Sequence, residues 1–275
     1  MIIDSHQHFW KYDPVRDDWM DDSMAVIRKD FLPSDLKPIF EANGVDGCVA
    51  VQADQSEEET QFLLNLAINH DFIKGVVGWV DFLDANVEER LEYFASHNSI
   101  KGFRHIVQAE PDPNFMLRED FQSGIGCLSS FGFTYDILVY PHQLPAAIEM
   151  VRKFPNQKFV LDHIAKPEVS KGMDERWAQH INTLAEAPNV CCKLSGMVTE
   201  TENFEWKETE FYPFMEAVLE AFGTDRILFG SDWPVCLVAG TYENVVSIVA
   251  NFVQQLSPTE QQNIMGLNAV RFYNL

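Results

Sequence analysis

Short apolar runs alternate with longer amphipathic stretches along the whole of this chain. Eight of the runs have the length and composition of β-strands: Ile2–His6, Asp46–Ala53, Gly75–Asp81, Gly102–Val107, Thr134–Val139, Lys158–His163, Val190–Ser195 and Ile227–Ser231. Most are continuous runs of Val, Ile, Leu and Phe, which is typical of parallel strands covered on both faces. Because these strands alternate with helical patterns, the sequence predicts βαβ units and a parallel sheet.

The stretches between the strands carry helix signals. Ser56 is followed by three acidic residues and then by an apolar stripe, which predicts a helix capped by this serine. Pro258 lies in the first turn of a helix that is predicted to run toward Tyr273. Further helices are predicted over Asn86–His97, His142–Phe154, Asp174–Ala187 and Glu210–Phe222.

Eight strand–helix units in 275 residues fit a closed (β/α)8 TIM barrel, formed as one domain by residues 1–275. The alternative, a doubly wound open sheet, is disfavoured because no Gly-x-Gly-x-x-Gly motif follows any of the strands. Two segments are interpreted as insertions, Phe9–Pro33 after the first strand and Val198–Phe211 after the seventh. Both are expected at the C-terminal ends of the strands, where barrel enzymes place their active sites.

Composition excludes several classes of partner. The net charge of −22 disfavours nucleic acids and anionic lipids, which proteins bind largely through Lys and Arg. No apolar run approaches the ~20 residues that span a bilayer, and the N-terminus lacks the basic and apolar regions of a secretory signal. The five cysteines are odd in number and lie mostly in apolar runs, which suits free thiols in a reducing compartment. We therefore expect a cytoplasmic protein, and the oligomeric state stays open.

Polar residues interrupt or end five of the predicted strands. In a barrel the C-terminal ends of the strands converge on one mouth, so these side chains are expected to lie together. They are His6 and His8 at the first strand, Arg104 and His105 at the fourth, Asp162, His163 and Lys166 at the sixth, Lys193 and Ser195 at the seventh, and Asp232 and Trp233 at the eighth.

His6 and His8 form a His-x-His pattern that suits a metal ion. Residues i and i+2 of a strand point to the same side, so both imidazoles can reach one ion. On its own the pattern is weak, because two surface or capping histidines explain it more often than a metal site does. His163 and Asp232 on later strands strengthen the metal interpretation, because His and Asp are common Zn²⁺ ligands.

Asp232 closes an apolar strand, where solvation explains a carboxylate poorly. It can act as a general base, because a strand end holds a carboxylate beside its water; the alternative is a cap or a turn residue before Pro234. Arg104 needs a partner for its permanent charge, and either Asp81 or a carbonyl-bearing ligand could supply it. His105 alternates with Arg104, so only one of the two is expected to face the mouth.

The aromatic residues of the first insertion are expected to pack that segment rather than to bind sugar; they are Phe9, Trp10, Tyr12 and Trp19. No Gly-x-Ser-x-Gly elbow, Walker loop, Cys-x-x-Cys pair or zincin motif is present. Chemistry through a covalent acyl-enzyme is therefore disfavoured.

Together, five motifs resemble those of the amidohydrolase superfamily, in particular its amidohydrolase 2 branch. They occur in the expected order over nearly the whole chain and are specific as a set. They are Ile3-Asp4-Ser5-His6-Gln7-His8-Phe9-Trp10, Gly102-Phe103-Arg104, Leu161-Asp162-His163-Ile164-Ala165-Lys166-Pro167, Lys193-Leu194-Ser195-Gly196 and Phe229-Gly230-Ser231-Asp232-Trp233-Pro234. Within that branch the pattern is most similar to lactonases of L-fucono- and L-rhamnono-lactones.

The resemblance implies a role for each matching residue. His6 and His8 match the paired histidines of the first strand, and His163 matches the histidine of the sixth. Asp232 matches the aspartate of the eighth strand, which is the general base for the attacking water. Arg104 matches an arginine in the substrate pocket of the lactonases.

One departure concerns the metal. Metal-dependent members usually carry a His or a carboxylated Lys on the fourth or fifth strand, but the fifth strand here, Thr134–Val139, ends without either. The family also includes lactonases that need no metal. Two interpretations stay open, namely one dispensable Zn²⁺ or direct contact with the substrate, in both cases through His6, His8, His163 and Asp232.

The resemblance implies hydrolysis of a small-molecule sugar lactone. Asp232 would deprotonate the attacking water, while His163, Arg104 or a bound metal stabilises the oxyanion, an effect worth ~3–4 kcal/mol. Further contacts with the substrate are expected from His6, His8, His105, Lys166 and Trp233. Two alternatives are a metal-dependent decarboxylase or hydratase of the same superfamily and a non-catalytic sugar-binding protein.

Overall fold

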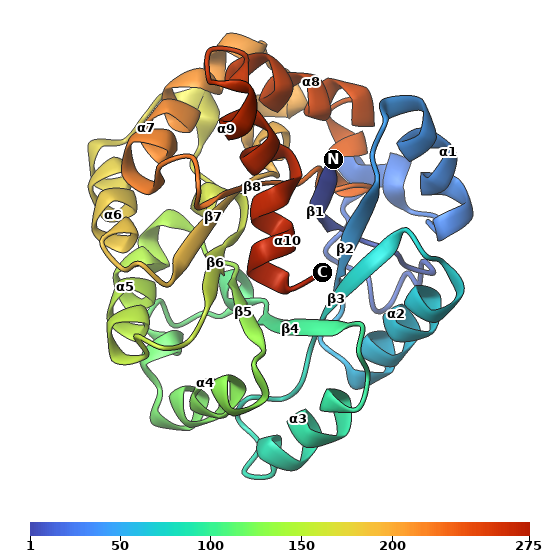
Figure 1. Ribbon diagram of the computed structural model, residues 1–275, viewed down its shortest axis with the longest axis vertical. Coiled ribbons are helices and arrows are strands. Elements are labelled where there is room, and N and C mark those ends of the chain that lie inside the picture. The colour runs from blue at the N-terminus through green and yellow to red at the C-terminus, as the bar shows by residue number, and fades with distance from the viewer.

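The computed structural model, which describes residues 1–275, is a ring of eight parallel strands surrounded by helices (Figure 1). Each strand pairs with the next along the chain, from β1 to β8. Between β8 and β1 the ring closes through a parallel bridge from Gln7 to Trp233, beside which the His8 N–H donates to the Trp233 carbonyl at 2.6 Å. The predicted (β/α)8 TIM barrel is therefore confirmed.

All eight predicted strands are present, and no predicted end lies more than three residues from the observed end. Two strands, β3 and β4, begin two residues earlier than predicted, because Lys74 and Lys101 interrupt the apolar pattern near their starts. The strands are β1 (Ile3–Gln7), β2 (Gly47–Val51), β3 (Ile73–Gly78), β4 (Ile100–His105), β5 (Thr134–Ile137), β6 (Phe159–Leu161), β7 (Val190–Leu194) and β8 (Ile227–Phe229).

Helices follow the strands and form the outer layer of the barrel (Figure 1). As predicted, Ser56 caps α2, and its hydroxyl accepts a hydrogen bond from the Glu59 N–H at 3.2 Å. The helices are α1 (Pro33–Asn43), α2 (Glu57–Asn69), α3 (Val87–Ala95), α4 (Glu119–Phe131), α5 (Leu144–Lys153), α6 (Glu175–Ala185), α7 (Tyr212–Phe222), α8 (Tyr242–Val253), α9 (Pro258–Gln262) and α10 (Asn268–Tyr273), with a π-helical turn at Asn263–Leu267 between the last two.

The sequence patterns do not predict α1, α4 and α8. Helix α1 contains Pro38, helix α4 contains Gly124 and Gly126, and five of the twelve residues of helix α8 are Val or Ile, which favour strands. Gly124 has a packing role, because a Cβ atom there would lie 2.4 Å from the Phe82 carbonyl oxygen. In each helix, tertiary packing outweighs a weak local propensity.

Two apolar clusters make the core. The larger one contains 68 buried residues and fills the space between the strands and the outer helices. The smaller one lies inside the ring and combines side chains of the strands with Ala269, Phe272 and Tyr273 of α10. Figure 1 shows α10 crossing the centre of the ring, so this helix forms the floor of the barrel.

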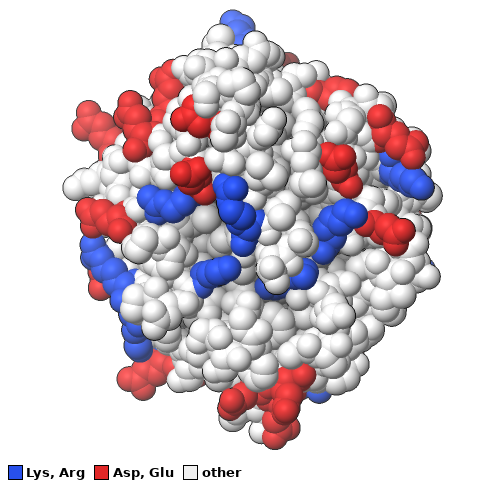
Figure 2. Space-filling view, in the orientation of Figure 1, with Lys and Arg blue, Asp and Glu red and all other residues white.

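Basic side chains hold the floor in place. Lys101, at the start of β4, donates to the Asn274 carbonyl at 3.0 Å, and Lys158, just before β6, donates to the Phe272 carbonyl at 3.4 Å. Figure 2 shows Lys and Arg gathered across the middle of this face, with Asp and Glu around its rim. Cations near a helix C-terminus are favourable, because the unpaired carbonyls there carry partial negative charge.

Both predicted insertions lie at the opposite end of the barrel. The segment after β1 contains a 3-10 helix at Asp22–Ile27 and a bridge between Trp10 and Phe31. The segment after β7 forms short 3-10 turns and brings Glu200 within 3.1 Å of Lys166. None of the helices is long and apolar enough to cross a membrane.

Candidate active site

A cavity of about 240 Å³ opens at the C-terminal ends of the strands. One side is apolar and the other carries ionisable groups, which is a common arrangement in sites for small polar molecules. Five predicted site residues line it directly, and His6 lies beneath them without reaching its surface. The lining residues are His8, Trp10, Trp19, Ala53, Arg104, Ile106, Gln108, Ala109, Leu138, His163, Lys166, Asp232 and Val235.

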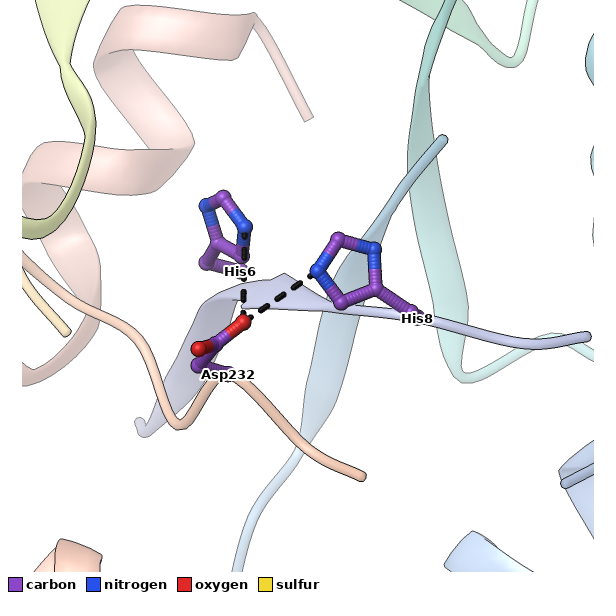
Figure 3. Close-up of side chains that lie close together, drawn as sticks. All are labelled: His6, His8 and Asp232. Carbon is purple, nitrogen blue, oxygen red and sulfur yellow. Dashed lines mark hydrogen bonds and ion pairs between the residues drawn. The ribbon is translucent and has the colours of Figure 1, made fainter. Parts of the chain in front are cut away.

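His6, His8 and Asp232 form the centre of the cluster (Figure 3). The first two come from the end of β1, and Asp232 follows β8, the neighbouring strand in the ring. Asp232 Oδ1 lies 3.2 Å from His8 Nε2 and 3.8 Å from His6 Nε2. The backbone supports this geometry, because the Asp232 N–H donates to the His6 carbonyl at 2.7 Å.

The environment of His8 leaves room for a cation. Its Nδ1 lies 2.7 Å from the Val51 carbonyl, which can only accept, so the hydrogen of the neutral ring is on Nδ1. The Nε2 lone pair then faces the Asp232 carboxylate at 3.2 Å. Two acceptors at this distance require a proton or a metal ion between them. The donor atoms of His6, His8 and Asp232 lie within 4.8 Å of one another, so these residues fit one divalent ion.

His163 adds a neutral imidazole to the site. Its Nδ1 lies 2.8 Å from the Ser195 hydroxyl, and its Nε2 lies 3.9 Å from Asp232 Oδ1. Burial lowers the pKa of His163 well below its ordinary value of 6.5. Burial raises the pKa of Asp232, but the neighbouring His163, His8 and Lys166 side chains lower it more, so the pKa falls below its ordinary value of 3.8. Asp232 is therefore an ionised carboxylate at neutral pH.

The backbone around these residues is unusual. The four consecutive residues 163–166 all have positive φ values, between 48° and 61°, and Asp232 has a φ of 59°. The run includes Ile164, a β-branched residue that rarely adopts this conformation. Strained backbone of this kind clusters at functional sites, where the surrounding packing maintains it.

Arg104 reaches the cavity from β4, and its charge is balanced by Asp162 rather than by Asp81. Its Nη1 lies 3.0 Å from Asp162 Oδ2 and 3.2 Å from His6 Nε2, and its Nη2 donates to the Gln52 carbonyl. The guanidinium Nε has no hydrogen-bond partner in the protein. A buried donor without a partner is uncommon in proteins, and this one belongs to a side chain that lines the cavity.

A layer of buried charges lies below the cavity. Lys193 Nζ is 2.6 Å from Asp136 Oδ2, 2.9 Å from Asp162 Oδ1 and 3.1 Å from His6 Nδ1. The side chains of Lys193, Asp136, Asp162 and His6 are fully buried. Burial lowers the pKa of His6 well below 6.5, so this ring is neutral.

Two predicted substrate contacts lie away from the cavity. The ring of His105 stacks on Phe115 with their centroids 5.0 Å apart, and its Nε2 lies 2.7 Å from Glu110 Oε1. Trp233 is buried against Phe9 and Phe31. Of the alternating pair on β4, Arg104 thus faces the mouth and His105 faces the helices.

Lys166 does line the cavity, where it pairs with Glu200 at 3.1 Å. Two other lining residues, Trp10 and Trp19, are not predicted from the sequence, where they are assigned to the packing of the insertion. The two tryptophans both pack the insertion and line the cavity. Their rings pack against each other with centroids 6.2 Å apart, and both form part of the cavity wall. Trp10 follows the polar end of the first strand, and this position is the signal that could have identified it.

Comparison with known proteins assigns the family. The family model described as Amidohydrolase matches residues 3–275. The chain belongs to the amidohydrolase family. Among named members, an L-fucono-1,5-lactonase of Burkholderia multivorans is 37% identical over 287 residues, covering 99% of this chain and 96% of the relative. An L-fucono-1,5-lactonase of Burkholderia ambifaria is 33% identical over 278 residues, covering 99% and 95%.

A solved amidohydrolase structure agrees closely with this fold. The crystal structure of an amidohydrolase from Burkholderia multivorans with bound Zn matches with a TM-score of 0.96 and 37% identity, covering 100% of this chain and 99% of that chain. The present amidohydrolase likewise has a group of His and Asp side chains that could hold a divalent ion. The predicted family and the predicted capacity for one metal ion are both confirmed.

Proposed function

We propose that this amidohydrolase opens the ring of a sugar lactone by hydrolysis, with L-fucono-1,5-lactone as the first substrate to test. The observation that carries the proposal is identity of 37% and 33% over nearly the whole chain with two L-fucono-1,5-lactonases. The cavity fits this chemistry, because it has an ionised carboxylate on one side and apolar side chains on the other. The decarboxylase or hydratase alternative is not favoured, since these two relatives are lactonases.

In the proposed reaction, Asp232 is the general base. A water molecule between its carboxylate and the lactone loses a proton to Asp232 as the oxygen attacks the carbonyl carbon. A positioned base of this kind contributes about 10²–10⁴-fold to the rate. The neutral imidazole of His163, 3.9 Å from Asp232 Oδ1, supports this assignment, because it is close enough to help orient the same water.

The developing oxyanion requires hydrogen-bond donors. Arg104 carries a permanent charge and lines the cavity, so it is the proposed donor. Loss of one preorganised donor typically costs about 3 kcal/mol of transition-state stabilisation. When the tetrahedral intermediate collapses, the ring oxygen leaves with the proton that Asp232 accepted. Lys166, which lines the cavity beside Glu200, is the proposed partner of the product carboxylate.

A divalent ion, when bound, would be held by His6, His8 and Asp232 and would polarise the lactone carbonyl and acidify water. His163 lies on the edge of this set, with its Nε2 directed toward Asp232. Two cations in the same region, Arg104 and Lys193, disfavour a second ion. We therefore propose one dispensable metal ion at most.

The test is Asp232→Asn assayed on L-fucono-1,5-lactone with a pH indicator, after subtraction of spontaneous hydrolysis. The side chains are nearly isosteric, so the fold should persist while kcat falls about 10²–10⁴-fold. Asp71→Asn, at an exposed position, serves as the control and should keep full activity. Each assay is repeated with a chelator.

Two outcomes would contradict the proposal. If Asp232→Asn keeps most of its kcat, another group activates the water, and His163→Gln is the next variant. If the wild-type protein binds sugar lactones but turns none over, with or without added Zn²⁺, it is a sugar-binding protein. The second outcome would refute the proposed lactonase function. The first would refute only the role of Asp232 as the general base.

A further inference from the structure

Lys166 lies at the boundary between two cavities. The inner cavity is the one that Asp232 lines, with a volume of about 240 Å³, and the outer cavity beside it has a volume of about 540 Å³. Lys166 lines both, whereas Glu200 and Tyr140 line only the outer cavity. Lys166 Nζ lies 3.1 Å from Glu200 Oε1 and 5.8 Å from the centre of the Tyr140 ring. Glu200 therefore reaches Lys166 from outside the inner cavity.

Local structure fixes the position of Glu200. It ends a 3-10 turn, Met197–Glu200, in the segment after β7. On either side of it, the hydroxyls of Thr199 and Thr201 each donate to the carbonyl three residues earlier, at 2.8 Å and 2.9 Å. The side chains of Lys166 and Glu200 are 16% and 15% exposed, so salt screens their attraction less than that of a fully exposed pair.

Both cations that line the inner cavity are paired with a carboxylate. Arg104 Nη1 lies 3.0 Å from Asp162 Oδ2, and Lys166 is paired with Glu200. Apart from two histidines, the remaining ionisable residue in the lining is an acid, Asp232. The inner cavity therefore has no positive charge in excess that would favour a carboxylate over a neutral ligand.

Of the two balancing carboxylates, Glu200 is the one that can be replaced without disturbing the cavity. Asp162 is fully buried, and its Oδ1 also lies 2.9 Å from Lys193 Nζ and 3.3 Å from His6 Nδ1. Glu200 is paired with Lys166 alone and contributes nothing to the wall of the inner cavity. A change at position 200 thus alters the charge balance of the inner cavity but not its shape.

We propose that Glu200 is a specificity-determining residue, which neutralises Lys166 and thereby makes the inner cavity favour neutral sugar ligands over sugar acids. The inference rests on the proposed function for the identity of these ligands, since a lactone is neutral and its hydrolysis product is a carboxylate. With Glu200 in place, Lys166 holds the product carboxylate weakly, which favours its release. Without Glu200, the full charge of Lys166 is available to a carboxylate in the inner cavity.

Isothermal titration calorimetry with L-fuconate and L-fucose tests the inference without reference to turnover. The two probes share a carbon skeleton, but L-fuconate carries a carboxylate and L-fucose is neutral. In Glu200→Gln the dissociation constant of L-fuconate should fall about 10-fold, because a hydrogen bond to a charged group contributes at least that much affinity. The dissociation constant of L-fucose should stay the same. A chelator removes metal ions, and NaCl at about 0.15 M screens charges beyond about 8 Å.

Glu202→Gln is the matched control, because it removes the same charge from an exposed position two residues away. It should leave the dissociation constants of both probes unchanged. Adding Lys166→Gln to Glu200→Gln should abolish the gain in L-fuconate binding, since the cation that Glu200 neutralises is then absent. The wild type provides a test that needs no variant, because it should bind L-fuconate no more tightly than L-fucose.

Several results would overturn the inference. They are equal binding of L-fuconate by Glu200→Gln and wild type, an equal gain in Glu202→Gln, and no binding of either probe by any of the proteins. If the wild type hydrolyses no lactone but Glu200→Gln still binds L-fuconate more tightly, the proposed function fails while this inference stands. If the wild type hydrolyses the lactone and Glu200→Gln shows no gain, the function stands and the role of Glu200 is wrong.

Discussion

At the scale of single residues, Gly196 determines how much space His163 has. It has a φ of 62°, and a Cβ atom there would lie 2.5 Å from His163 Nδ1. That nitrogen is also 2.8 Å from the Ser195 hydroxyl, so the ring has little freedom to move without losing this contact. A side chain at position 196 would therefore displace His163 relative to Asp232.

Gly196→Ala should reduce kcat by about 10–100-fold, because small displacements of catalytic groups have effects of that size. Gly132→Ala is the matched control, since Gly132 has a φ of 73° and a Cβ atom there would have no neighbouring atom within 4 Å. Both variants should lose about 1 kcal/mol of unfolding free energy through the left-handed backbone, and Gly196→Ala should lose more because its Cβ atom would meet His163. Steady-state kinetics and urea unfolding measure the two effects. Equal kcat values for the two variants would show that the position of His163 is unimportant.

The sequence predicts the ionisable residues that gather at the mouth, because strand ends converge there in any barrel. His6, Arg104, His163 and Asp232 come together as this convergence requires. The pattern does not identify Asp136 as a partner of Lys193, since an inward-facing aspartate in the middle of a strand has no distinctive residues around it. Contacts between side chains more than 50 positions apart depend on the register between strands, which the pattern leaves undetermined.

At the scale of elements, the first turn of α2 contains a buried acid. Glu59 Oε1 accepts a hydrogen bond from the Ala53 N–H, and burial raises the pKa of Glu59 to about 7. Since this pKa is above the unfolded value of 4.5, the stabilising contribution of Glu59 is complete in acid. It is lost as the pH rises through about 7, because the buried carboxyl must then ionise.

Glu59→Gln should therefore remove a pH dependence of stability. The free energy of unfolding of wild type should fall over this range, and that of the variant should not. From about pH 5 to about pH 8.5 the variant should therefore gain up to about 3 kcal/mol relative to wild type, because one pKa unit corresponds to about 1.4 kcal/mol. Urea unfolding at the two pH values measures the gain. Glu58→Gln, at the exposed neighbouring position, should show no such gain. If both variants follow the wild-type pH dependence, Glu59 ionises without cost.

The strands of this protein are predicted from the sequence better than its helices are. Strands are predicted well because a buried parallel strand is a continuous apolar run, and eight such runs stand out. Helices α1, α4 and α8 contain proline, glycine or β-branched residues that oppose a helix locally. They form because each has a buried face that packs on the barrel, and such packing is invisible in a short window of sequence.

At the scale of the whole molecule, the charge of −22 affects a neutral substrate and an anionic product differently. The proposed reaction converts an uncharged lactone into a carboxylate inside a strongly acidic protein. Long-range repulsion should weaken product binding at low ionic strength, and salt should screen that repulsion over a Debye length of about 10 Å at 0.1 M.

Product inhibition should therefore strengthen as salt is added, whereas KM for the lactone should stay nearly constant. Measuring the inhibition constant of the hydrolysed product over a series of NaCl concentrations checks this expectation. Weaker product inhibition at high salt would show that the local cations Arg104 and Lys166 dominate the interaction.

The left-handed backbone at residues 163–166 bears on how the protein can be redesigned. Each residue in such a conformation costs on the order of 1–3 kcal/mol, so this run depends on the packing around it. An engineer who wishes to change the accepted lactone should therefore leave it intact. The apolar wall offers safer positions, because Ile106, Leu138 and Val235 line the same cavity and none has a positive φ. Under the proposed lactonase function, a library can therefore vary the apolar wall of the cavity while it preserves the backbone that positions His163.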